Sequence, residues 1–181
     1  GMSGQPGGMW SKMGGTGTGQ EDSLLTAMIE AEFGLEMTYV PFSGGGTVAK
    51  NLIGDVINST VNNPSEQLGF YQAGRSVPLV AFTEERLAAF PDVPTARELG
   101  HDIVYVMQRS FVGPADMPAE AVDYYRGLFQ QLSETEEWQT YTSEKALMPA
   151  YLTGDDLQAY FLAEREKHRA ILAEMEGEGQ S

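Results

Sequence analysis

Two glycine-rich segments are the places in this sequence where the residue types best suit ligand binding. Gly14-Gly15-Thr16-Gly17-Thr18-Gly19 directly precedes a predicted helix, and Ser43-Gly44-Gly45-Gly46-Thr47 lies between a predicted strand and a predicted helix. The free N–H groups and the dipole at a helix start attract anions, and glycine lets a ligand approach the backbone closely. Neither segment contains a base or a nucleophile, so the chemistry they suit is anion binding rather than catalysis.

Each segment also has a purely structural interpretation. The first could be a flexible entry to its helix, and the second a tight turn with positive φ, which glycine adopts easily. The dinucleotide pattern GxGxxG is not met, because Gln20 stands where a third glycine is required after Gly15 and Gly17, and no Walker lysine follows. No nucleotide cofactor is predicted.

Asn62 and Asn63 add amide groups after another predicted strand. Their side chains could offer donors and acceptors to a polar ligand, although both residues also suit the turn before Pro64. His101 and His168 are the only histidines, and the chain contains no cysteine. Thiolate nucleophiles, Cys-ligated metals and His-rich clusters are therefore excluded. The sequence predicts no catalytic set and no metal site.

The charge of the chain excludes further classes of partner. Its 181 residues include 26 acidic and 11 basic side chains, a formal net charge of −15. Nucleic-acid binding depends on neutralising phosphates with Lys and Arg, so no nucleic acid is expected as a partner. An anionic membrane surface is disfavoured for the same reason.

Regular elements must position the glycine-rich segments, and the hydrophobic periodicity of the sequence predicts those of an α/β fold. Strands and helices alternate as far as about Gln108, which favours a parallel or mixed sheet. The predicted strands cover 37–42, 56–61, 77–82 and 103–107, and the predicted helices between them cover 21–33, 47–53 and 64–72.

Beyond Pro114 the pattern changes to helices alone, predicted at 118–132, 134–145 and 155–175. We therefore expect three parts in the chain. Residues 1–12 form a disordered leader or tag, residues 13–107 form an α/β ligand-binding domain, and residues 108–181 form a mainly helical part.

Several short motifs follow one another in a distinctive order. They include Gly15-Thr16-Gly17-Thr18-Gly19-Gln20-Glu21-Asp22, Tyr39-Val40-Pro41-Phe42-Ser43-Gly44-Gly45-Gly46, Val61-Asn62-Asn63-Pro64-Ser65-Glu66-Gln67 and Pro91-Asp92-Val93-Pro94-Thr95. Together, from about Met13 to Met175, they resemble the substrate-binding receptors of tripartite tricarboxylate transporters, the TctC or Bug family.

The resemblance implies a class II periplasmic-binding-protein-like fold with a mixed sheet, in which two α/β lobes close on a small carboxylate. It implies a periplasmic receptor without catalysis or cofactor, which serves the membrane permease of its transporter. The ligand, a di- or tricarboxylate, would be held largely through backbone amides. The ligand-binding residues implied are Gly15, Thr16, Gly17, Thr18, Gly19, Gln20 and Asp22, with Ser43, Gly45, Gly46, Asn62 and Asn63 near the same cleft.

In family terms, residues 13–107 correspond to the second lobe and residues 108–181 to C-terminal elements that complete the first lobe. The export signal and the N-terminal half of the first lobe have no counterpart in this sequence, so the resemblance is to a truncated receptor. The helices of 108–181 have apolar faces that would lack their usual sheet, and exposed apolar patches mark interaction surfaces. They comprise Val122, Tyr125, Leu128, Phe129, Leu132, Leu157, Phe161, Ile171 and Leu172.

We expect these faces to pack on the remaining lobe or to pair two copies as a homodimer. The alternative function is then an interaction or oligomerisation protein that binds no small ligand. A third hypothesis, a small enzyme acting on a phosphorylated substrate, lacks candidate reactive side chains.

Overall fold

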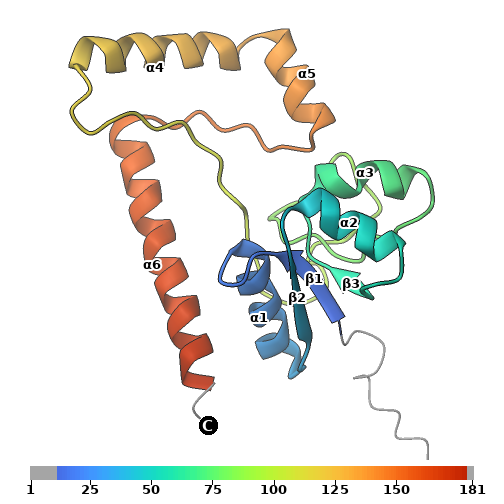
Figure 1. The fold of residues 1–181 in the computed structure, drawn as a ribbon. Coiled ribbons are helices and arrows are strands. Elements are labelled where there is room, and N and C mark those ends of the chain that lie inside the picture. The colour runs from blue at the N-terminus through green and yellow to red at the C-terminus, as the bar shows by residue number, and fades with distance from the viewer. Residues whose placement is uncertain (1–11, 179–181) are drawn as a thin grey trace, which may run out of the picture. The chain divides into compact units, whose positions relative to one another are not determined.

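The computed structural model describes residues 12–178, with side chains described up to residue 173 (Figure 1). These residues form two compact units. One holds the residues up to Val106 together with those from Ile171 onward, and the other holds Met107–Ala170. Strands and helices alternate in the first unit and helices alone occupy the second, which confirms the predicted α/β class.

A small parallel sheet forms the centre of the first unit. β1 (Lys12–Thr16) lies between β2 (Thr38–Phe42) and β3 (Ser59–Thr60), and both pairings are parallel. Its central position buries β1 from Met13 to Gly15. A Cβ on Gly14 would overlap the Cδ1 of Ile57, so this strand position requires glycine for a close packing contact.

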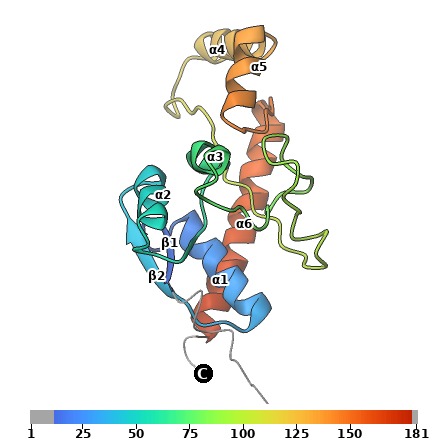
Figure 2. The same cartoon turned by 90° about the vertical axis from the view of Figure 1, so that its right-hand side faces the viewer.

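Helices cover the two faces of this sheet. α1 (Glu21–Phe33) lies on one face and α2 (Gly45–Ile53) on the other, while α3 (Pro64–Gln72) packs against α2 (Figures 1 and 2). This arrangement follows from the strand order. From β1 the chain crosses to β2 on one side of it, and from β2 it crosses back past β1 to β3 on the other side. Right-handed crossovers in opposite directions place their helices on opposite faces of the sheet.

Local signals in the sequence set the ends of these helices. Gly34 ends α1 in the left-handed conformation with a φ of 60°, and its N–H donates to the carbonyl of Glu30. Pro64 occupies the first turn of α3, where its missing N–H leaves no intrahelical bond unmade. The predicted bounds of α1 and α3 are confirmed.

The segment from Ala73 to Val106 in the first unit is irregular, and the predicted strand over 77–82 is wrong. Only Ala81 forms a bridge, a parallel one with Thr95. Pro78 interrupts the run and cannot donate to a strand ladder, while Val77 is 79% exposed. The segment is held instead by a small core of Ala81, Phe90 and Val93.

Four further expectations about the strands and the sheet need correction. Only residues 59–60 of the predicted strand over 56–61 pair with β1, and 103–107 forms no strand although Ile103 and Tyr105 are buried. Lys12, assigned to a disordered stretch at 1–12, is the first residue of β1; residues 1–11 lie outside the described part of the chain. The described strands pair only in parallel, one of the two sheet types that the alternation favoured, whereas the family resemblance implied a mixed sheet.

The second unit contains α4 (Ala119–Ser133), α5 (Glu136–Glu144) and the part of α6 (Gly154–Glu178) up to Ala170. Thr135 caps α5, where its hydroxyl accepts from the N–H of Trp138 at 3.2 Å. Across residues 107–170, Thr142 is the only buried residue. This unit therefore has no hydrophobic core of its own. None of the helices within residues 12–178 has the length and apolar character needed to cross a membrane.

Ile57 tests the packing of the central strand. Its side chain is 1% exposed and fills the space beside Gly14, so Ile57→Ala should lower the free energy of unfolding by about 2–5 kcal/mol. The exposed Val77→Ala should change it by less than about 0.5 kcal/mol. Urea denaturation of both variants measures this difference, and equal stabilities would contradict the packing described.

Candidate functional site

The three segments predicted to bind a ligand leave the same edge of the sheet. β1, β2 and β3 are parallel, so their carboxyl ends meet at one edge, from which residues 17–20, 43–44 and 61–63 lead to α1, α2 and α3. Ligands of open α/β sheets bind outside this edge, where neighbouring loops diverge to helices on opposite faces. The loops after β1 and β3 diverge in this way.

A tight turn joins β1 to α1. The N–H of Gln20 donates to the carbonyl of Gly17 at 3.3 Å, and the N–H of Gly19 donates to the hydroxyl of Ser23 at 2.8 Å. Gly19 has a φ of 79°, a left-handed conformation that side chains rarely adopt. Thr18 and Gln20 are exposed at the tip of this turn.

Hydrogen bonds with two residues, Asp22 and Tyr39, fix Thr16 at the start of the turn. One carboxylate oxygen of Asp22 accepts from the Thr16 N–H at 2.8 Å and from its hydroxyl at 3.0 Å. The hydroxyl of Tyr39 donates to the Thr16 carbonyl. A Cβ on Gly15 would overlap the Tyr39 oxygen and lie 2.7 Å from the Asp22 Cβ. Gly15 is therefore required by this clamp, which we define as Thr16, Asp22 and Tyr39.

Burial shapes the electrostatics of the clamp. It raises the pKa of Asp22 above its ordinary value of 3.8, although the two hydrogen bonds from Thr16 oppose the shift. Burial, with the nearby Asp22 charge, raises the pKa of Tyr39 to about 12. The Tyr39 hydroxyl therefore stays protonated at neutral pH and can donate its hydrogen bond. The Asp22 carboxylate faces the turn between β1 and α1, where it accepts from Thr16.

The start of α1 offers free backbone donors. Gln20 at its N-cap makes no side-chain cap, and the first bond into the helix is from the Leu24 N–H to the Gln20 carbonyl. Within the described residues, the N–H groups of Glu21, Asp22 and Ser23 therefore have no partner. Such a cluster of N–H groups, reinforced by the helix dipole, attracts an anion.

The start of α2 is occupied by a carboxylate of the protein itself. Gly45 at this start is buried, and a Cβ on it would overlap both carboxylate oxygens of Glu66. One of these oxygens accepts from the side-chain amide of Asn62 at 3.0 Å and from the Asn63 N–H at 3.2 Å. Glu66 was not among the residues predicted to form the site, although its spacing from Asn63 is that of a capping box, which the structure contains.

The side-chain amide of Asn62 forms hydrogen bonds within the protein through both its nitrogen and its oxygen. Its nitrogen donates to Glu66 and to the carbonyl of Gly45 at 3.2 Å. Its oxygen accepts from Gln67 at 2.7 Å and from the hydroxyl of Thr60 at 3.1 Å. Ser43 and Gly46, by contrast, are exposed. The structure thus brings all the predicted residues to one sheet edge but engages Asn62, Asn63 and Gly45 around Glu66.

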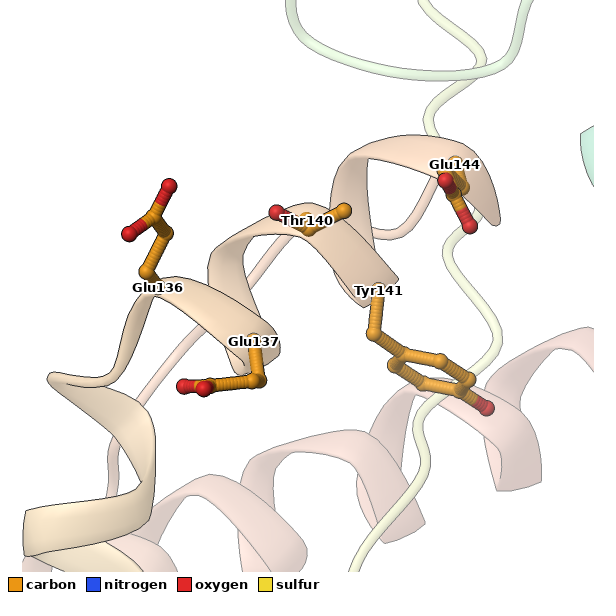
Figure 3. Close-up of a pocket in the computed structure, with 5 residues that line it drawn as sticks. All are labelled: Glu136, Glu137, Thr140, Tyr141 and Glu144. Atoms are coloured by element: carbon orange, nitrogen blue, oxygen red, sulfur yellow. The ribbon is translucent and has the colours of Figure 1, made fainter.

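A shallow concavity on α5 is a weaker candidate. Its lining residues come from this one helix, and Glu136 and Tyr141 point in opposite directions (Figure 3). The full lining is Glu136, Glu137, Thr140, Tyr141 and Glu144. Three carboxylates repel an anion, and the residues enclose no cavity. No group of three or more acidic or histidine side chains in the described part of the chain could hold a metal ion.

The sequence matches a known family over residues 6–176, described as the TctC tripartite tricarboxylate transporter family receptor. Among curated proteins, it is 29% identical over 83 residues to Protein BugT of Bordetella pertussis. That match covers 46% of this chain and 26% of BugT.

Two solved structures share the fold. A TctC solute-binding protein from Polaromonas, without ligand, has a TM-score of 0.72 at 21% identity, and the match covers 90% of this chain and 57% of that one. The R. palustris protein Rpa4515, solved with adipate, has a TM-score of 0.82 at 20% identity, covering 88% and 54%. The chain thus spans little more than half the length of these proteins.

The clamp predicts a sharp difference between two glycines. Gly15→Ala forces a methyl group against Tyr39 and Asp22 and should lower the free energy of unfolding by about 1–3 kcal/mol. Gly46→Ala adds a methyl where nothing lies within 4 Å, inside a helix, and should stabilise by about 0.5–1 kcal/mol. Thermal unfolding checks both. A Gly15→Ala protein as stable as the wild type would contradict the clamp.

The raised pKa of Asp22 predicts a pH dependence of stability. Between 3.8 and its raised pKa, the folded protein binds more protons at Asp22 than the unfolded chain does, so this group lowers stability as the pH rises through that window. Asp22→Asn removes this titration. The difference in unfolding free energy between variant and wild type should therefore shift in favour of the variant across the window.

Urea titrations at a series of pH values measure that difference. The exposed Asp116→Asn serves as the control for loss of one carboxylate. Parallel pH profiles for Asp22→Asn and the wild type would show that Asp22 titrates alike in both states.

Proposed function

This chain belongs to the TctC family of tripartite tricarboxylate transporter receptors, and we propose that it binds small di- or tricarboxylates as an extracytoplasmic solute-binding receptor. Its family is one of receptors, not of enzymes. The observation that carries the proposal is the open start of α1, where Glu21, Asp22 and Ser23 present free N–H groups at the ligand-binding edge of a parallel sheet.

The chemistry of a carboxylate fits this set of donors. A carboxylate accepts several hydrogen bonds, and bonds from N–H groups to a charged acceptor are shorter and stronger than neutral ones. The net charge of −15 does not forbid this, because aligned N–H groups act at short range inside a site. A structural neighbour solved with adipate, a dicarboxylate, supports this ligand class.

The same proposal assigns roles to the predicted site residues. Gly15, Thr16, Gly17, Thr18, Gly19 and Gln20 form the turn that presents the free amides, and the carboxylate lies against the turn and the first N–H groups of α1. The Asp22 backbone N–H faces the ligand, whereas its carboxylate acts through Thr16, since both of the bonds to that carboxylate come from Thr16. Periplasmic location and delivery to a membrane permease follow from family membership and belong to the proposal.

Glu21→Pro tests the free amides directly. Glu21 is the first residue of α1, where proline is tolerated, and Gln20 before it already has an extended backbone with a ψ of −179°. The substitution removes one N–H and keeps the helix. Since a hydrogen bond to a charged group contributes about 1.5–3 kcal/mol, affinity should fall roughly 10–100-fold.

Glu21→Ala is the matched control, because it removes the same carboxylate and keeps the N–H. Calorimetric titration of both variants and the wild type with adipate, succinate, glutamate and citrate measures the effect. Equal affinity of the Pro and Ala variants would contradict binding at α1. An absence of binding by the wild type would contradict the proposed ligand class.

A second candidate function, self-association through the C-terminal helices, rests on the surface of α4. None of the residues of this 15-residue helix is buried, and Tyr124, Tyr125, Leu128 and Leu132 are all exposed. Tyr125, Leu128 and Leu132 follow helical spacing and form one apolar stripe. A homodimer would cover such a stripe without requiring a small ligand.

Leu128→Glu tests the homodimer. Leu128 is 44% exposed, so a charge there should leave folding intact but abolish pairing, and sedimentation should then report a monomer. Gln130→Glu adds the same charge to the opposite side of α4 and should leave the dimer unchanged. A wild-type protein that sediments as a monomer at all concentrations would exclude this function.

A further inference from the structure

We propose that Glu66 is a built-in carboxylate that occupies the second glycine loop and keeps a ligand carboxylate out of it. Gly45 and Gly46 resemble an anion site as closely as the turn before α1 does, because both segments are glycine-rich and start a helix without a side-chain cap. The two starts differ in what lies against them.

The contacts around Glu66 are those expected of a bound carboxylate. Its oxygens lie where a Cβ on Gly45 would be, so a side chain at that position would displace them. One oxygen accepts from a side-chain amide, Asn62, and from a backbone amide, Asn63, at 3.0 and 3.2 Å. These are the donor types that bind carboxylate ligands in proteins.

The position of Asn62 is fixed from the other side. Its amide oxygen accepts from Gln67 and Thr60, and its nitrogen also donates to the Gly45 carbonyl. The Thr60 hydroxyl also lies 2.8 Å from the carbonyl of Gly14 in the central strand. Glu66 therefore rests in a cradle, defined here as Gly45, Asn62 and Asn63, which links the starts of α2 and α3 and is bonded to Thr60 of β3.

Because Glu66 fills the cradle, the second glycine loop is less available to a ligand carboxylate than the turn before α1. A second carboxylate beside Glu66 would meet a like charge, and it would find the Asn62 amide and the Asn63 N–H already bonded to Glu66. In this unit a ligand carboxylate is then restricted to the turn and the start of α1. This consequence for ligand choice rests on the proposed receptor function, whereas the filling of the cradle by Glu66 does not.

Chemical rescue by formate tests the cradle without reference to any transported ligand. Glu66→Ala empties it and should lower the midpoint of thermal unfolding by roughly 3–12 °C, the size expected for a lost charged acceptor in a chain of this length. Sodium formate should then restore at least about half of that loss, relative to sodium chloride of equal ionic strength, because it binds only the folded variant.

Two control variants distinguish formate binding in the emptied cradle from a general effect of formate on stability. Glu66→Gln fills the cradle with a neutral side chain of the same shape and should show no specific response to formate. Glu36→Ala removes an exposed glutamate elsewhere in the same unit and should behave as the wild type. Should Glu66→Ala be unfolded in chloride, the folded fraction in formate replaces the midpoint as the measured quantity.

The outcomes separate this inference from the proposed function. Rescue of Glu66→Ala alone supports the built-in carboxylate, even if the wild type binds no dicarboxylate. Equal responses of Glu66→Ala and Glu36→Ala to formate, or a Glu66→Ala protein that folds in neither salt, would overturn it. So would a wild type that binds dicarboxylates with an affinity that Gly46→Ala abolishes, since that result would place the ligand on α2.

Discussion

The parallel pairing of three short strands around β1 is the constraint on which the rest of the first unit depends. Because β2 and β3 both run parallel to β1, the starts of α1, α2 and α3 converge on one edge of the sheet. Gly14 at the middle of β1 leaves room for the buried side chain of Ile57. Segments that are far apart in sequence, the turn after β1 and residues 43–46 and 61–63, are thereby brought together.

The starts of α1, α2 and α3 differ in whether a carboxylate of the protein lies against them. α1 begins without a cap and keeps its first N–H groups free, while the clamp of Thr16, Asp22 and Tyr39 holds the turn before it. The carboxylate of Glu66 accepts from the Asn63 N–H at the start of α3 and lies against Gly45 at the start of α2. The negative charge of Glu66 beside α2 and α3 therefore favours the start of α1 as the place where an anion binds.

The sequence predicts features whose physical causes are local. The ends of α1 and α3 follow from Gly34 and from Asn63-Pro64, and the prediction of an anion-binding turn follows from its glycines. β1 escaped prediction because Gly14 and Gly15 give no hydrophobic alternation, and its pairing depends on distant strands. The contact between Glu66 and Gly45 joins two helices and is equally non-local. Pro78 explains why the apolar run over 77–82 forms no ladder.

Backbone amide NMR during a titration with adipate tests the central claim, that an anion binds at the open start of α1, most directly. Binding there predicts large, saturable shifts for the amides of Glu21, Asp22 and Ser23, whose N–H groups have no partner in the described structure. The amides of Gly45 and Gly46 should respond weakly, because Glu66 occupies that start. Large shifts at Gly45 and Gly46 with unchanged amides at α1 would contradict the claim.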